Sequence, residues 1–266
     1  MSTVLPLYRR ALGDSWRSLI AWSLGVVAAI GLYVPLFPSI GGNPDVQALL
    51  ETLPPELVNA IGYDSIGTGS GYVHSTFYGL IGFVLIVIAA TSWSTTAIAG
   101  DEESGSLELT LAHGVTRTQV VLERTAAVLT RLLWLAVLSM LLVLAFNDSA
   151  GLEIEFGNLL AEAAAFLGLA TLSASLGLAV GALTGRRAYA TSAAAGIAVL
   201  GYALNAIANQ SADLDWLHSW SPYGWAYAEL PLQNGADWPG LALLYGASVA
   251  LTAVATLALN RRDLSP

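Results

Sequence analysis

Six long apolar runs constrain this chain more than any other feature of its sequence. Crossing the hydrocarbon core of a bilayer as a helix takes about 20 residues. We place six spans at about Leu19–Phe37, Tyr72–Ile98, Val120–Phe146, Leu159–Leu183, Tyr189–Ala208 and Leu241–Leu259. The second and third runs exceed the minimum length, so we expect them to tilt or to project beyond the lipid. The sequence therefore predicts an all-α membrane protein whose residues 1–266 form one transmembrane domain.

The composition agrees with a polytopic membrane protein. Charged residues make up 11% of the chain, whereas an average soluble domain carries roughly 25%. There is no cysteine, which excludes disulfides and thiolate metal sites. The three histidines, at positions 74, 113 and 218, show no ligand spacing, so we expect no metal or cofactor. The net charge of −9 argues against nucleic acid as a partner.

The distribution of basic residues predicts the orientation of the chain. All ten basic residues are arginines, and with six spans each falls on or near the side that holds both termini: Arg9, Arg10, Arg17, Arg117, Arg124, Arg131, Arg186, Arg187, Arg261 and Arg262. The opposite loops carry acids but no basic residue. By the positive-inside rule, both termini lie in the cytoplasm. We expect a multi-pass protein of a prokaryotic plasma membrane.

The first residues suggest a separate helix before the first span. Apolar residues recur at helical spacing from Leu5 to Leu19, and the arginines fall largely on other faces. This pattern predicts an amphipathic helix over residues 5–18 that lies along the inner membrane interface, in contact with lipid. The alternative is an extended start of the first span.

Two outer segments carry further signals. "LPPELVNAIG" (residues 53–62) predicts a short helix that prolines open and a glycine closes. The aromatic-rich segment before the last span contains four tryptophans and two tyrosines within residues 216–238. It reads either as an aromatic anchor at the headgroups or as a partly re-entrant hairpin broken at Pro222 and Pro231.

Within the spans, small and polar residues favour packing roles. Ser173, Gly177 and Gly181 form a row that lets helices approach closely, either within one subunit or between two. The middles of the spans carry almost no charge, and Glu162 lies near the outer end of its helix. The second span carries hydroxyl side chains within residues 91–96, but no histidine or aspartate in the spans accompanies them as the base of an intramembrane hydrolase would. We expect Arg131 to lie a turn or two inside the membrane and to snorkel toward the surface.

The loop after the second span, "GDEESGSLELTLAHGVTR" (residues 100–117), predicts a helix of its own. Three acids and a Ser-Gly break precede it, Ser106 can cap it, and Gly114 can end it, which gives a helix over about 104–114. Thr116 or Thr118 can cap the helix that follows. A short exposed helix with few apolar residues gains little stability alone. We therefore expect it to dock on another protein.

This region resembles the signature of type-2 ABC transporter permeases. The resemblance rests on "GDEESGSLELTLAHGVTRTQVVLERTAA" (residues 100–127), with its acids, a Gly-Ser-Leu-Glu core, Leu-Ala, a glycine and Thr-Arg. Gly114 stands where the family often has proline, and Arg124 where it often has lysine. The interfacial helix, the first outer loop, the six spans and "WSPYGW" also fit, so the resemblance covers nearly the whole chain.

The resemblance implies a mechanism and a set of partners. Two permease subunits pair, as a homodimer or a related heterodimer, and each coupling helix sits in a cleft of a cytoplasmic ABC ATP-binding subunit, which binds ATP and Mg. We expect the acids and Glu108 to make polar contacts there, with Leu107 and Leu111 as an apolar anchor. The coupling residues on this interpretation are Asp101, Glu102, Glu103, Gly105, Leu107, Glu108, Leu111, Ala112 and Arg117.

The absence of lysine bears on the source of energy. A Walker A loop needs a lysine on the nucleotide phosphates, and the chain has none. We therefore expect no catalytic site here and a separate ATPase. The family resemblance implies export, and the apolar spans suggest a hydrophobic or amphipathic substrate, although no substrate-path residue is assigned. The main alternative is a secondary transporter or channel, which would usually carry ionisable residues near the midplane; an intramembrane enzyme or a scaffold fits less well.

Overall fold

The structure, a computed structural model, describes residues 5–41, 43, 52 and 66–262. Within these residues it consists of helices and turns and contains no strand. Six helices are long and apolar enough to cross a membrane: Trp16–Ile40, Gly69–Glu103, Arg117–Asn147, Phe156–Thr184, Arg187–Ala208 and Trp238–Arg261. The predicted all-α class and the six spans are confirmed. Most helices extend past the apolar runs because polar flanking residues continue them.

The first two spans are built from several helical pieces. The first contains α2 (Trp16–Tyr33), η1 (Val34–Leu36) and α3 (Phe37–Ile40). The second contains α6 (Gly69–Val73), the π-helix η2 (His74–Ile81), α7 (Gly82–Thr95), the π-helix η3 (Thr96–Gly100) and α8 (Asp101–Glu103). The wider turns of a π-helix interrupt the regular hydrogen-bond ladder and often mark functional positions.

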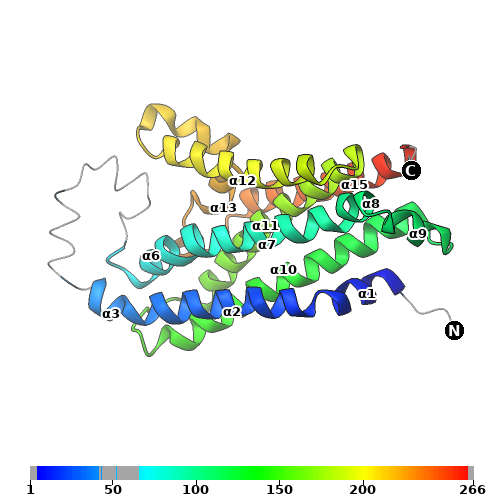
Figure 1. Ribbon diagram of the computed structural model, residues 1–266. Coiled ribbons are helices and arrows are strands. Elements are labelled where there is room, and N and C mark those ends of the chain that lie inside the picture. Colours follow the sequence, from blue (N-terminus) through cyan, green and yellow to red (C-terminus); the bar gives the residue numbers. More distant parts are fainter. Residues whose placement is uncertain (1–4, 42, 44–51, 53–65, 263–266) are drawn as a thin grey trace.

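The later spans are single helices arranged around α11. They are α10 (Arg117–Asn147), α11 (Phe156–Thr184), α12 (Arg187–Ala208) and α15 (Trp238–Arg261). α11 packs against α7, α10, α12 and α15, and Figure 1 shows it inside the bundle, with α2 on the opposite side of α10. Most residues of α11 are buried, and many of these are alanine, glycine or serine. Small side chains let neighbouring backbones approach closely, so α11 is the central helix.

The small-residue row on α11 serves packing within the subunit. A Cβ added at Gly177 would lie 2.7 Å from Ser94 Oγ and 3.1 Å from Ala194 Cβ. One added at Gly181 would lie 3.3 Å from Ala99 Cβ. The row therefore faces α12 and the second span of the same chain. Of the two alternatives that the sequence left open, packing within one subunit is the one observed. Ser94, one of the hydroxyl residues at 91–96, likewise serves as a helix contact.

We expect Gly177→Leu to lower the free energy of unfolding by about 1–3 kcal/mol, because the added side chain overpacks a closed contact. Thermal or denaturant unfolding in detergent would measure this change. Gly246→Leu is the matched control, since Gly246 is also inside a helix and has no heavy atom within 4 Å of its ideal Cβ. Equal effects of the two substitutions would contradict the packing role of Gly177.

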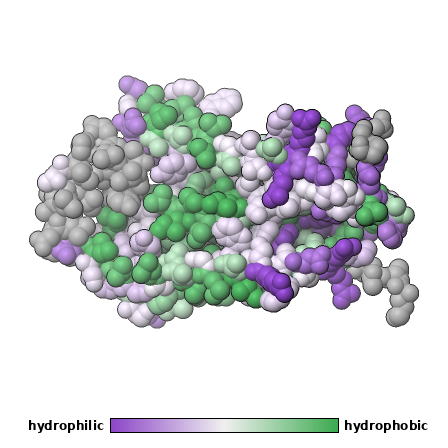
Figure 2. All heavy atoms as spheres, in the orientation of Figure 1, coloured by the Kyte–Doolittle hydropathy of each residue, from purple (hydrophilic) through white to green (hydrophobic). Residues whose placement is uncertain are grey.

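Both termini of the described chain lie at the same end of the bundle. Figure 1 shows α1, α8, α9 and the C-terminal end of α15 together there, and the α12–α13 connection at the opposite end. Hydrophilic side chains gather at this terminal end, and hydrophobic ones spread across the middle of the face in view (Figure 2). The arrangement agrees with arginines concentrated on one side. Which side is cytoplasmic stays a prediction.

The N-terminal segment forms α1 (Pro6–Asp14), separated from α2 by a break at Ser15. The Ser15 hydroxyl donates to the Ala11 carbonyl at 2.7 Å. α1 packs along α10, and the buried Glu123 carboxylate accepts the backbone N–H groups of Leu7 and Tyr8 at 2.7 and 2.9 Å. A carboxylate at a helix N-terminus satisfies free donors and complements the helix dipole. A separate helix is therefore present, while its place at a membrane interface stays a prediction.

The segment before the last span divides into exposed and buried parts. It contains η4 (Ala212–Trp220), α13 (Pro222–Tyr227) and α14 (Pro231–Asn234), so both prolines open short helices. Trp216, Trp220 and Trp238 are exposed, as an aromatic anchor would be. α13 instead packs between α12 and α15.

α13 is fixed in place by hydrogen bonds to neighbouring helices. The Tyr223 hydroxyl donates to the Gly79 carbonyl at 2.8 Å, and the Ser221 hydroxyl donates to the Gly201 carbonyl at 2.6 Å. The choice between an aromatic anchor and a re-entrant hairpin stays a prediction. The helix predicted for residues 53–62 lies outside the described residues.

Candidate functional site

The segment between the second and third spans forms two short helices joined by a tight turn. α8 ends the second span, and α9 (Ser106–Ala112) follows it. Gly105, between them, has a φ of 73°, a left-handed conformation that glycine adopts without steric cost. The expectation that Ser106 caps α9 is wrong. Gly105 holds the cap position, and the Ser106 hydroxyl donates to the Asp101 carbonyl at 3.1 Å.

The end of α9 and the start of α10 follow the sequence prediction. Gly114 has a φ of 82°, and its N–H donates to the Leu111 carbonyl at 3.2 Å. Thr116 then caps α10, because its hydroxyl accepts the backbone N–H of Gln119 at 3.1 Å. Glycine and threonine at these positions satisfy backbone groups that helix ends leave free.

All three acids of α8 are engaged within the chain. Asp101 forms an ion pair with Arg124 of α10, which also donates to the Ala97 carbonyl in η3. Glu102 pairs with Arg262, just past the end of α15. Glu103 Oε1 accepts the backbone N–H of Arg187, at the start of α12, at 2.8 Å. The acids therefore connect α8 to three other spans.

Arginines also bind the free carbonyl ends of the neighbouring helices. Arg117 Nη1 donates to the Leu259 carbonyl at 2.7 Å and to the Arg262 carbonyl. Arg262 Nη1 donates to the Ala182 carbonyl, near the end of α11, at 3.0 Å. A cation near a helix C-terminus complements the helix dipole and satisfies carbonyls that lack an intrahelical partner. α8, α10, α11 and α15 thus meet in one polar joint.

The two leucines predicted as an apolar anchor for the partner, Leu107 and Leu111, both pack toward the bundle of their own chain. Leu107 is fully buried in a cluster with Ile98, Val121 and Leu178, and the half-buried Leu111 packs against the same cluster. Leu107 thus packs α9 against the spans of the same subunit.

The outward face of α9 carries other residues. Glu108 and Ala112 are exposed, and Leu109 is 66% exposed. The sequence reasoning did not select Leu109, although its position next to Glu108 in a short helix was a usable signal.

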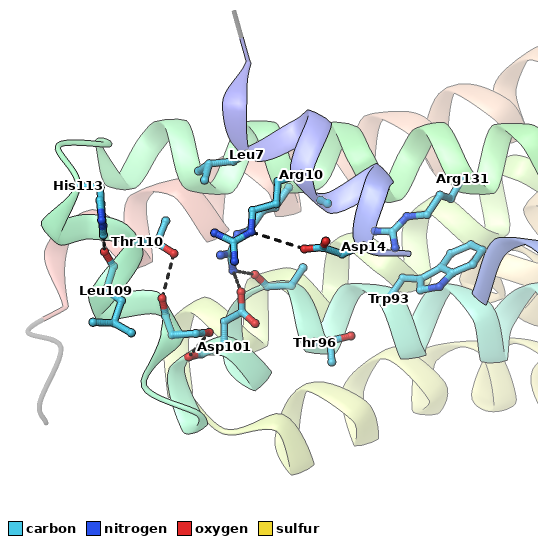
Figure 3. Close-up of a pocket in the computed structure, with 14 residues that line it drawn as sticks. Leu7, Arg10, Asp14, Trp93, Thr96, Asp101, Leu109, Thr110, His113 and Arg131 are labelled. Carbon is cyan, nitrogen blue, oxygen red and sulfur yellow. Dashed lines mark hydrogen bonds and ion pairs between the residues drawn. The ribbon is translucent and has the colours of Figure 1, made fainter. Parts of the chain in front are cut away.

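A cavity of about 490 Å³ lies beside this joint, between α1, the second span, α9 and α10. Figure 3 shows Arg10 and Asp14 from α1, Asp101 from α8, Leu109 and Thr110 from α9, and His113 just after α9 around it. The cavity is bordered by the same α8–α9 segment that carries the predicted coupling residues.

Arg131 closes the inner side of this cavity. Its guanidinium lies over the Trp93 ring, 4.9 Å from the centroid, and its Nε donates to the Ala127 carbonyl at 3.0 Å. The residue is only 6% exposed. The side chain extends one turn toward the start of α10, but Trp93 and the cavity walls cover its guanidinium; snorkelling toward a membrane surface stays a prediction.

A buried ionisable pair lies toward the opposite end of the bundle. His74 Nδ1 and Glu162 Oε1 are 2.8 Å apart, and both side chains are buried. Tyr227 packs edge-on against His74, with ring centroids 4.9 Å apart. The sequence does not predict this pair of side chains. His74 lies in the second apolar run and Glu162 in the fourth, and no spacing rule joins them.

We expect Glu162→Leu to lower the free energy of unfolding by about 3 kcal/mol or more, because it leaves the buried His74 without its partner. In the double variant His74→Leu/Glu162→Leu, the cost should be less than the sum of the two single substitutions, since no unpaired polar group remains. Unfolding in detergent would measure all three.

The matched control for this cycle is the exposed His218–Asp215 pair, at 3.0 Å, where Asp215→Leu should cost no more than about 1 kcal/mol. If the loss of unfolding free energy in the double variant equalled the sum of the losses in the two single variants, the two side chains would not be a coupled pair.

Comparison with known proteins gives one result for the whole chain. A family model described as "ABC-2 family transporter protein" matches residues 5–264, which is nearly the entire sequence. No curated protein is detectably similar.

Proposed function

This chain belongs to the ABC-2 transporter family and is a membrane permease subunit, and we propose that a separate cytoplasmic ATP-binding subunit drives it through α8 and α9. The observation that carries the proposal is that α9 is fixed to the bundle on one side and exposes Glu108, Leu109 and Ala112 on the other. A partner bound to that exposed face would move α9. The polar joint would then pass the movement to the spans.

The predicted coupling residues take two different roles in this proposal. Glu108, Leu109 and Ala112 are the contact surface for the ATP-binding subunit, with Leu111 at its edge. Asp101, Glu102, Glu103, Leu107 and Arg117 transmit movement, because each is bound to another helix or buried beneath α9. Gly105 provides the turn between the two helices. ATP can shift the spans only if the partner contacts α9 differently in its two states.

The proposed assembly contains two permease subunits, identical or related, in a prokaryotic plasma membrane. Both termini, α8 and α9 face the cytoplasm, as the arginine distribution predicts. ATP and Mg belong to the partner subunit, since the chain lacks the lysine of a P-loop.

We expect Leu109→Arg to abolish copurification of the ATP-binding subunit, because it replaces the large apolar side chain of the exposed face of α9 with a charged one. The chain would be tagged, expressed with the ATP-binding subunit encoded nearest to it, and recovered in mild detergent. Glu102→Gln should instead retain the partner but lose substrate-stimulated ATP hydrolysis, since it breaks the joint to Arg262 and leaves the contact face intact.

Arg261→Glu is the control for these variants, because Arg261 is exposed at the same end but outside α9. Stoichiometric recovery of the partner with Leu109→Arg would contradict docking on α9. Recovery of the chain alone, with every candidate ATPase, would favour a transporter that is not driven by ATP.

The proposal extends to export of a hydrophobic or amphipathic compound. The exposed surfaces of the spans are largely apolar. The purified complex should hydrolyse ATP several-fold faster when amphipathic compounds are added, and inside-out vesicles should accumulate those compounds with ATP. Stimulation by hydrophilic ions alone would contradict this substrate class.

A further inference from the structure

The Arg131 guanidinium has no carboxylate partner among the described residues. Its Nε donates to the Ala127 carbonyl. None of the ion pairs among the described residues involves its Nη1 or Nη2. The Trp93 ring stabilises the charge from one face. A buried cation is costly unless it is paired. The charge therefore favours an anion in the cavity that it borders.

Among the residues that line the cavity, the charged side chains other than Arg131 form opposite pairs; Glu123, which accepts the N–H of the lining residue Leu7, is not part of the lining. Arg124 pairs with Asp101, and Arg10 lies 3.5 Å from Asp14. The lining carries three arginines and two aspartates, which together give a formal charge of +1. That excess charge corresponds to Arg131, the most deeply buried of the three arginines. The cavity thus attracts a single negative charge at its inner side.

We propose that this cavity binds a phosphate group, carried by an anionic phospholipid or by a soluble phosphate ester. The planar guanidinium fork matches phosphate oxygens with two parallel hydrogen bonds. The volume of about 490 Å³ lies in the range of ligand-binding pockets. The Arg10 guanidinium also lines the cavity and offers further N–H donors besides its contact with Asp14 (Figure 3).

The surroundings favour a lipid as the source of the phosphate. Leu7, Ala11 and Leu109 add apolar surface to the lining, and α1 carries the amphipathic pattern of an interfacial helix. An occupant would contact α1, α9 and α10 together. The cavity shares Leu109 with the proposed docking face, but its test needs neither the transported substrate nor the ATP-binding subunit.

The test is lipid retention by the purified chain, measured by native mass spectrometry after incubation with equal phosphatidylglycerol and phosphatidylcholine. Phosphatidylcholine carries the same phosphate without a net charge. We expect clear preference for phosphatidylglycerol, weakened about tenfold in Arg131→Gln, because a charge-assisted pair is lost. Arg131→Lys should retain part of the preference, since it keeps the charge and loses the fork.

The matched control is Arg186→Gln. Arg186 also lies over an aromatic ring, that of Tyr189 at 5.8 Å, but it is exposed and outside the cavity, so its loss should leave the preference unchanged. Arg10→Gln, at the exposed rim, supplies a second test if Arg131→Gln does not fold, and should weaken retention several-fold.

A soluble arm distinguishes the two sources of phosphate. Thermal unfolding would be followed with added glycerol 3-phosphate and inorganic phosphate. Stabilisation by these ions, lost in Arg131→Gln, together with equal retention of both lipids, would assign the site to soluble phosphates. Equal retention of both lipids without such stabilisation would overturn the proposal, as would an unchanged preference in both Arg131→Gln and Arg10→Gln.

Discussion

The pairing of the three acids in α8 with groups on other helices is the interaction on which the terminal end of this protein depends. Helix ends leave carbonyl and N–H groups without partners, and here several such ends meet. Asp101 and Glu102 hold Arg124 and Arg262, and those arginines in turn satisfy carbonyls of η3 and α11. If the acids were absent, the arginine cations and the free carbonyls would still lie together, and no negative charge would compensate the arginines.

This joint explains how so short a helix as α9 keeps a fixed position. Seven residues cannot form a stable helix alone. Leu107 supplies buried apolar area beneath α9, the Gly105 and Gly114 turns set its ends, and α8 ties its start to three spans. On the proposed coupling, a force on the exposed face of α9 would reach α10, α12 and α15 through the partners of the three acids in α8.

The sequence predicted the large elements well and the side-chain partners poorly, for a physical reason. Spans, caps and turns depend on local patterns, so the six helices, the Thr116 cap and the Gly114 terminus could be predicted. The pairings depend on how distant helices pack. Glu102 lies 160 positions from Arg262 in sequence, and His74 lies 88 from Glu162, so no spacing rule connects them.

Arg131 shows why the depth of a charge cannot be judged from its place in an apolar run alone. A lone arginine on a helix in lipid would extend toward water, because nothing nearby compensates its charge. Here α7 brings Trp93 beneath the guanidinium, and α1 and α9 enclose a polar cavity beside it. The tertiary fold thus provides locally what the lipid cannot, and the cost of keeping the arginine inside is reduced by packing that only the folded chain creates.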